Sequence, residues 1–129
     1  MNKLTNPDGT RRGYMGPDTV VSDTAHIGPY ARIEDHAQVL DWGFAGDYAI
    51  VTDNAIIEKT GLIAGPAVAK GNAIITDKAI VDGNAVISGR ARIAGGVRVG
   101  GWAQILGNTV LIGDEVVGGT MIINGAGYE

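Results

Sequence analysis

Few side chains in this sequence could take part in chemistry, and their spacing does not form a catalytic pattern. The chain has no cysteine, so disulfides and thiolate metal sites are not available to it. Its two histidines are His26 and His36, and no serine or threonine lies in a recognisable nucleophile setting. We interpret both histidines as solvated or interface side chains rather than as general bases. The sequence therefore predicts no catalytic, cofactor-binding or metal-binding residue.

Carboxylates recur in this sequence at a spacing of eighteen residues. Asp35 and Asp53 form one such pair, and Asp41, Lys59 and Asp77 form a longer series. Stacked carboxylates could hold a calcium ion, or each could accept a hydrogen bond from its own turn. We favour the hydrogen-bonded interpretation. The lysine in the second series predicts an ion-pair ladder on the surface.

The spacing of eighteen is three times a shorter repeat that organises most of the chain. A large apolar residue recurs every six positions without insertion, and sixteen of the eighteen members are Val, Ile or Leu. The members are Val21, Ile27, Ile33, Val39, Ala45, Val51, Ile57, Ile63, Ala69, Ile75, Val81, Ile87, Ile93, Val99, Ile105, Leu111, Val117 and Ile123. Two residues before each member, up to Thr109, stands a small residue, of which Val97 is the largest.

Each hexad predicts one short strand and one tight turn. A small and a large residue two positions apart point to the same side of a strand. Asp, Gly or Pro follows two positions after every large residue except at Lys59, and these residues permit a tight turn. In several hexads the next residue is an asparagine that we expect to adopt a left-handed backbone, namely Asn54, Asn72, Asn84 and Asn108. A period of six does not give the apolar stripe of an α-helix.

Three hexads would close one triangular coil of eighteen residues, and the repeat is long enough for about six coils. Coils stacked at the strand spacing would form a prism roughly 29 Å tall. We therefore predict an all-β, single-stranded parallel β-helix. We assign residues 1–18 to an N-terminal arm without the repeat, 19–123 to the β-helix and 124–129 to a C-terminal tail. Glu115 and Met121 occupy positions for small residues, which predicts a distortion or a cap in the last coil.

The hexads resemble those of a known superfamily. The segment from Ala25 to Ile33 resembles the hexapeptide repeat of left-handed parallel β-helix proteins, and the segment from Gly83 to Ile93 resembles its variant with glycine two places after the large residue. The resemblance covers residues 19–123 and implies a left-handed coil. The superfamily contains acyltransferases, gamma-class carbonic anhydrases and proteins without known chemistry. Bactofilins resemble it in spacing but coil right-handed and polymerise, and they are an alternative for the fold.

The residues of this chain favour the non-catalytic branch of that superfamily. Its acyltransferases typically place a catalytic histidine beside an extruded loop and carry a C-terminal helix. This repeat leaves no room for such a loop, and residues 118–129 do not predict a helix. The gamma-class carbonic anhydrases use three histidines around a metal, and this chain has two.

The outward-facing position of the repeat, one residue before each large residue, is apolar in the middle of the chain. Eight consecutive members are apolar, and we call them the apolar belt: Phe44, Ile50, Ile56, Leu62, Val68, Ile74, Ile80 and Val86. On either side the same position carries His26, Arg32, Gln38, Arg92, Arg98 and Gln104. Strand propensity explains scattered apolar residues, but soluble monomers seldom expose a patch above a few hundred Å². We therefore predict that the belt is buried between chains.

The apolar belt predicts self-association. Proteins with the resembled fold commonly form trimers with parallel axes, so a homotrimer is the expected oligomer. Because the belt covers all three faces, we also expect a second partner, another structural protein of a larger assembly. Tyr30 with Tyr48, and Leu40 with Trp42, are further candidate contacts with a partner.

Composition excludes several other roles. The formal charge is −4 without a run of like charges, so we predict no nucleic-acid partner. No apolar run is long enough to span a membrane, and the polar segment 1–14 lacks the apolar core of a signal peptide. We expect a cytoplasmic location, or a virion if the protein is viral.

Together these observations predict a non-catalytic structural protein. It would be a homotrimeric β-helix building block of a larger assembly, and a virion component such as a capsid decoration or tail protein is the most concrete form of this hypothesis. One alternative is an acyltransferase-type enzyme of the hexapeptide-repeat class with a site between subunits. Another is a self-polymerising scaffold like the bactofilins.

Overall fold

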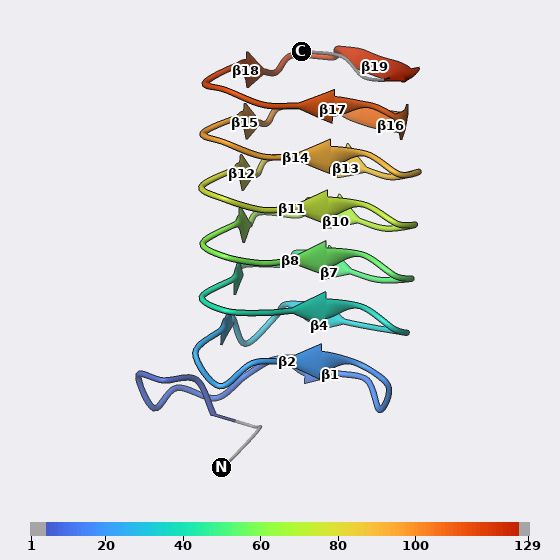
Figure 1. Cartoon of the computed structure of the whole chain (residues 1–129). Helices are drawn as coiled ribbons and strands as arrows, with labels where there is room; N and C mark the ends of the chain where they lie inside the picture. The colour runs from blue at the N-terminus through green and yellow to red at the C-terminus, as the bar shows by residue number, and fades with distance from the viewer. Residues whose placement is uncertain (1–4, 127–129) are drawn as a thin grey trace.

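The hexad repeat folds into short strands joined by tight turns (Figure 1). The structure, a computed structural model, describes residues 5–126, which contain strands and turns but no helix. Successive strands lie on three different sheets, so three hexads complete one coil. The predicted parallel β-helix of about six triangular coils is confirmed.

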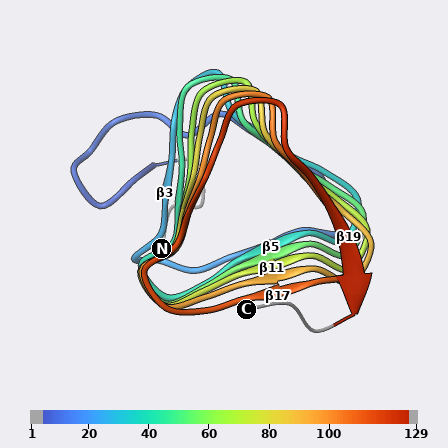
Figure 2. The same ribbon diagram turned by 90° about the horizontal axis from the view of Figure 1, so that it is seen from above.

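The three sheets are the faces of a triangular prism (Figure 2). The first face contains β1 (Tyr14–Met15), β4 (Arg32–Ile33), β7 (Ile50–Val51), β10 (Val68–Ala69), β13 (Val86–Ile87), β16 (Gln104–Asn108) and β19 (Ile122–Ala126). The second face contains β2 (Val20–Val21), β5 (Gln38–Val39), β8 (Ile56–Ile57), β11 (Ile74–Ile75), β14 (Arg92–Ile93) and β17 (Val110–Leu111). The third face contains β3 (His26–Ile27), β6 (Phe44–Ala45), β9 (Leu62–Ile63), β12 (Ile80–Val81), β15 (Arg98–Val99) and β18 (Val116–Val117). We call the turns that follow these faces the first, second and third corners.

The coil is left-handed. The chain rises from β1 near the bottom of Figure 1 to β19 at the top. Seen from above in Figure 2, it passes clockwise from the first face, marked by β19, through the second, marked by β17, to the third, marked by β3. A clockwise path toward the viewer is a left-handed helix, which differs from the right-handed coil of the bactofilins.

The core is a column of alternating small and large apolar side chains. Each large residue of the repeat from Ile27 to Leu111 is fully buried. Ala73, Ala79 and Ala85 are fully buried as well, so small and large residues share the interior as predicted. Strand pairing is parallel and joins residues eighteen apart throughout. Burying each large aliphatic side chain contributes roughly 1.5–3 kcal/mol, so the stacked core is the main source of stability.

The turns differ from the prediction in one respect. From Asp35 onward the left-handed backbone occurs at the first turn residue, at Asp, Gly or Lys59, where φ of the non-glycine residues lies between 51° and 57°. The asparagines that follow lie outside the positive-φ region, so their predicted left-handed backbone is wrong. Asn54 and Asn72 instead donate their backbone N–H to the carbonyls of Gly71 and Gly89 in the next coil, at 2.9 and 2.7 Å.

An N-terminal loop pairs with the lowest strand of the third face, β3. Asn6 is 3% exposed, and its side-chain amide pairs with both backbone groups of Ile27 at 2.8 Å, as a neighbouring strand would. Arg12 is 4% exposed and donates to the carbonyls of Ser22 and Ala25 at 2.8 and 2.7 Å. Strand β1 lies within residues 1–18, the predicted N-terminal arm, and it pairs with β4.

The last coil departs from the repeat. β16 and β19 are five residues long and pair through Asn108 and Ala126, where the hexad predicts a turn. Glu115 is half-buried and Met121 is 52% exposed, so neither is taken into the core as a small residue would be. The predicted distortion of this coil is therefore present.

Candidate interaction surface

The apolar belt occupies the outward position on all three faces. Every one of its eight side chains is half-buried, because neighbours above, below and beside it in the sheet cover its flanks. On the first face the belt runs through β7, β10 and β13, on the second through β8 and β11, and on the third through β6, β9 and β12. In each column the belt residues pair directly, as Leu62 does with Ile80. The belt is therefore three continuous apolar columns rather than scattered residues.

Polar residues bound each column at both ends. Below the belt lie His26, Arg32 and Gln38, and above it lie Arg92, Arg98 and Gln104. Arg32 forms an ion pair with Glu34 at 2.6 Å, and Arg98 forms one with Asp82 at 3.5 Å. Both pairs are largely exposed, so they contribute little to stability. Their effect is to mark where the apolar surface ends.

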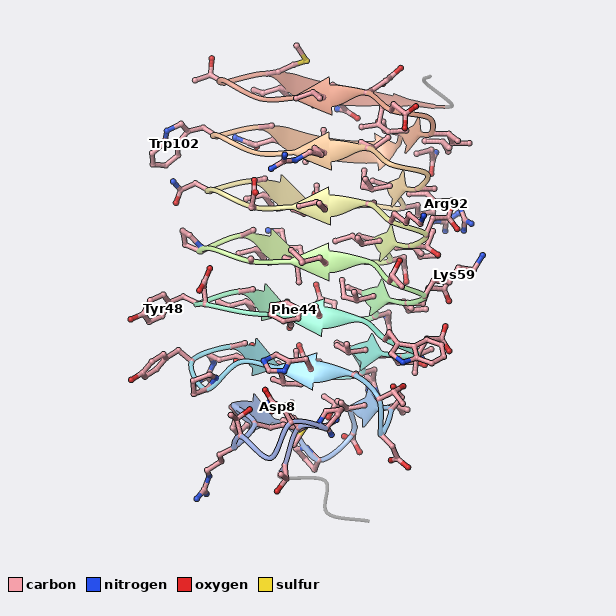
Figure 3. All side chains as sticks on the ribbon, turned by 90° about the vertical axis from the view of Figure 1, so that its left-hand side faces the viewer. Asp8, Phe44, Tyr48, Lys59, Arg92 and Trp102 are labelled. Atoms are coloured by element: carbon pink, nitrogen blue, oxygen red, sulfur yellow. The ribbon has the colours of Figure 1, made fainter. Side chains whose placement is uncertain are left out.

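Exposed aromatic side chains gather at the corners. Tyr30 and Tyr48 stack at the third corner with ring centroids 5.4 Å apart, and they are 66% and 63% exposed. Trp102 is 64% exposed and lies three coils above Tyr48 on the same edge (Figure 3). Trp102 is not among the predicted contacts, although its spacing from Tyr48, a multiple of eighteen, places it in this column.

The other pair of candidate contacts lies elsewhere. Leu40 is half-buried, and Trp42 is 66% exposed at the second corner. Figure 3 shows that edge, marked by Lys59, across the third face from Tyr48, with Phe44 between them. The structure therefore does not bring Leu40 and Trp42 together with the stacked tyrosines.

The two histidines occupy unrelated positions. His26 lies on the third face, and its ring stacks on Phe44 with centroids 4.6 Å apart and planes 6° apart. His36 is exposed at the first corner, where its backbone N–H donates to the carbonyl of Asp53. The described range 5–126 holds no group of three or more His, Asp or Glu side chains that could bind a metal ion.

The stacked carboxylates accept hydrogen bonds from the backbone. Asp41, Asp47, Asp53 and Asp77 each accept the N–H of the first turn residue in the next coil, at 3.0 Å. The bond from Gly95, followed by that from Lys59, holds the pKa of Asp77 below its usual 3.8. Lys59 Nζ lies 3.3 Å from Asp77, whereas Asp41 contacts the backbone N–H of Lys59 rather than its ammonium. The predicted ladder therefore contains one ion pair, Lys59–Asp77. Backbone N–H groups stabilise the charge of the other stacked carboxylates.

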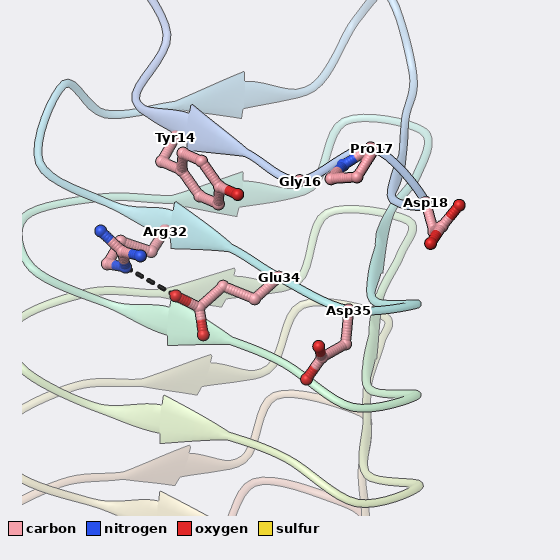
Figure 4. A pocket seen from close by; sticks show the side chains of 7 residues that line it. All are labelled: Tyr14, Gly16, Pro17, Asp18, Arg32, Glu34 and Asp35. Atoms are coloured by element: carbon pink, nitrogen blue, oxygen red, sulfur yellow. Dashed lines mark hydrogen bonds and ion pairs between the residues drawn. The ribbon is translucent and has the colours of Figure 1, made fainter.

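An open hollow lies beside the first face near the bottom of the prism (Figure 4). It measures about 250 Å³ and is lined by Tyr14, Gly16, Pro17, Asp18, Arg32, Glu34 and Asp35. The Arg32 guanidinium lies 4.8 Å from the centre of the Tyr14 ring and bonds to Glu34, so its charge is already engaged within the chain.

Comparison with protein-family models, curated proteins and solved structures gives no match to this chain. The described residues include no helix long and apolar enough to cross a membrane.

Proposed function

We propose that this chain is a non-catalytic structural building block of the hexapeptide-repeat β-helix class, which forms a homotrimer within a larger assembly. The left-handed coil and the small-to-large alternation of its hexads support the superfamily. The concrete form of the proposal is a virion component, such as a capsid decoration or tail protein, located in the cytoplasm or in the virion.

A single observation carries the proposal. One outward position of the repeat divides into polar, apolar and polar zones along the prism, and the apolar zone appears on all three faces. Strand propensity acts on every strand alike and would not produce such zones. Interface cores are depleted of charged residues and rich in apolar ones, so burial between chains would produce them. A trimer covers part of the belt, and another structural protein covers the rest.

Native mass measurement tests the proposal directly. We expect the isolated protein to have the mass of a trimer. Replacing Leu62 and Ile80 together by Lys should shift the mass to that of a monomer, because an unpaired ammonium is costly to bury. The fold should persist, since both side chains point away from the core. Gln38→Lys, at the same outward position below the belt, is the control and should remain a trimer.

Two results would contradict the proposal. A monomeric parent protein would remove the trimer, and a long polymer would favour the self-assembling scaffold instead. An acyl-transfer or hydration activity that disappears in His26→Ala or His36→Ala would favour the enzyme with an intersubunit site.

A further inference from the structure

We infer that the third corner faces the three-fold axis of the homotrimer, so that the third face of one copy turns toward the first face of the next. The inference rests on the proposed homotrimer and specifies which surface builds it. In a cyclic trimer with parallel axes, one corner of each copy approaches the axis, and the two faces beside that corner meet across the subunit boundary. The favoured corner is the one whose two flanking faces carry apolar residues at the same heights.

The faces beside the third corner match coil by coil. Outward residues six positions apart flank a corner at the same height, because one hexad separates them. Across the third corner three successive rows are apolar on both sides: Phe44 with Ile50, Leu62 with Val68, and Ile80 with Val86. The row below pairs His26 with Arg32, and the row above pairs Arg98 with Gln104. Apolar rows therefore meet apolar rows, and polar rows meet polar rows, without any axial shift between copies.

The other two corners do not match in this way. Across the first corner, apolar Val86 stands at the height of Arg92, so the apolar zone of one face would oppose a charged side chain. Across the second corner, Phe44 stands at the height of Gln38. Each of these corners leaves two fully apolar belt rows. An unpaired charge or amide against an apolar surface is costly to desolvate, so the third corner gives the best contact.

The distribution of charged residues at the corners also favours the third corner at the three-fold axis. Three copies of any residue near a three-fold axis are close together, and like charges there repel. At the two tip residues of its turns the third corner has one charged side chain, Asp47, and Asp82, just before a tip, is paired with Arg98. The second corner has six: Asp23, Asp41, Lys59, Asp77, Lys78 and Asp114. The first has four, Asp18, Asp35, Asp53 and Arg90, besides His36.

Exposed aromatic residues also favour the third corner. Tyr30, Tyr48 and Trp102 lie there, each more than 60% exposed in the single chain. Aromatic residues are enriched at interface cores, where they bury a large area with few rotatable bonds. The second face, with Ile56 and Ile74, is left on the outside of the trimer and remains free for the second partner.

Site-specific cross-linking tests the inference. Because the sequence has no cysteine, each introduced cysteine is the only thiol that can react. Three successive hexads offer matched sites at the tips of the turns: Asn72 at the first corner, Lys78 at the second and Asn84 at the third. Each is changed singly to Cys, and the purified variant is treated with a short bis-maleimide at low concentration. We expect linked chains for Asn84→Cys alone, with circular dichroism and native mass equal to those of the parent.

Lysine substitutions on each face give a second readout. Val68→Lys with Val86→Lys, on the first face, should convert the trimer to monomer, as should the third-face pair described above. Ile56→Lys with Ile74→Lys, on the second face, should leave the trimer mass unchanged.

The outcomes separate the inference from the proposal on which it rests. A monomeric parent defeats the proposed homotrimer itself. If the parent is a trimer, three results would show that the third corner does not face the axis, while the homotrimer itself would stand. These are cross-linking of Asn72→Cys or Lys78→Cys, no cross-linking of any variant, and dissociation of the trimer by the second-face lysines.

Discussion

The first turn residue is the most restricted position of the repeat after the core. From Asp35 onward it adopts a left-handed backbone, which glycine accepts freely and other residues accept at a cost. Aspartate is tolerated there because its carboxylate accepts an N–H from the next coil, as Asp53 does from Gly71. Lys59 has the same φ of 55° but cannot make that hydrogen bond. Its side chain forms only an exposed ion pair with Asp77.

Lys59→Gly should therefore stabilise the protein. A left-handed backbone costs an ordinary residue roughly 1–2 kcal/mol, and the flexibility of glycine in the unfolded chain offsets roughly 0.5–1 kcal/mol of that gain. We expect a net increase of about 0.5 kcal/mol, measured as a higher midpoint of denaturant unfolding. Lys78→Gly is the control, since Lys78 lies outside the positive-φ region and should lose stability. Equal effects of the two substitutions would contradict this explanation.

Thr76 is the other residue that departs from its surroundings. It is fully buried, and its hydroxyl has no hydrogen-bond partner among the described residues. Thr76→Val keeps the shape and removes the desolvated hydroxyl, so we expect a gain of about 1 kcal/mol in the free energy of unfolding. Thr52 occupies the same repeat position on the first face, and its hydroxyl donates to Asp35 at 2.8 Å. Thr52→Val should bring no gain, and an equal gain there would assign the effect to strand propensity instead.

At the scale of the elements, every strand except β16 and β19 is two residues long, and its partners are fixed by the width of the coil. The small residue of a hexad sits fully buried beside the large ones of the same coil, so its size sets the cross-section of the prism. Ala79→Leu should overfill one coil and cost roughly 1–3 kcal/mol, measured by denaturant unfolding. Lys78→Leu, an exposed neighbour, should cost much less. A neutral effect of Ala79→Leu would show that the core is loosely packed.

The elements also show how far the sequence alone reaches. The period and phase of Ile75, Val81 and Ile87 fix the inward side of every strand, so the register was predictable. The left-handed turn residue was assigned one position too late, because asparagine propensity suggested one residue and the geometry of the coil requires another. The pairing of Asn6 with Ile27 was not predictable, since it joins the repeat to a segment without any repeat.

The candidate surface was only partly predictable, for a similar reason. Position in the hexad shows that Leu62 and Ile80 point outward, and the structure places them half-exposed in one column. Which face meets another chain depends on how rows compare across corners, and that comparison needs the coil to be closed. What covers the belt is a property of an assembly, which no single hexad encodes.

At the scale of the whole molecule, stability should vary along the prism. Each coil contacts only the coils above and below it, as in other solenoids. Asn6→Ala leaves the N–H and C=O of Ile27 without their partners, at a cost of about 1–3 kcal/mol for each buried group. We expect faster amide hydrogen exchange near Ile27, with little change near Ile87, which lies more than three coils further along the prism. Asn72→Ala, at an exposed turn, is the control, and a uniform change along the prism would contradict this local effect.

The pairing of every strand with residues eighteen positions away limits which insertions and duplications the protein can tolerate during evolution. An insertion of one hexad keeps small and large residues inside but moves everything after it to the neighbouring face, which breaks each apolar column. Duplication of the gene segment for a whole coil lengthens the prism and leaves every column on its own face. An outward residue therefore stays on its face only when the length changes by a multiple of eighteen. We expect tolerated insertions and deletions to be complete coils.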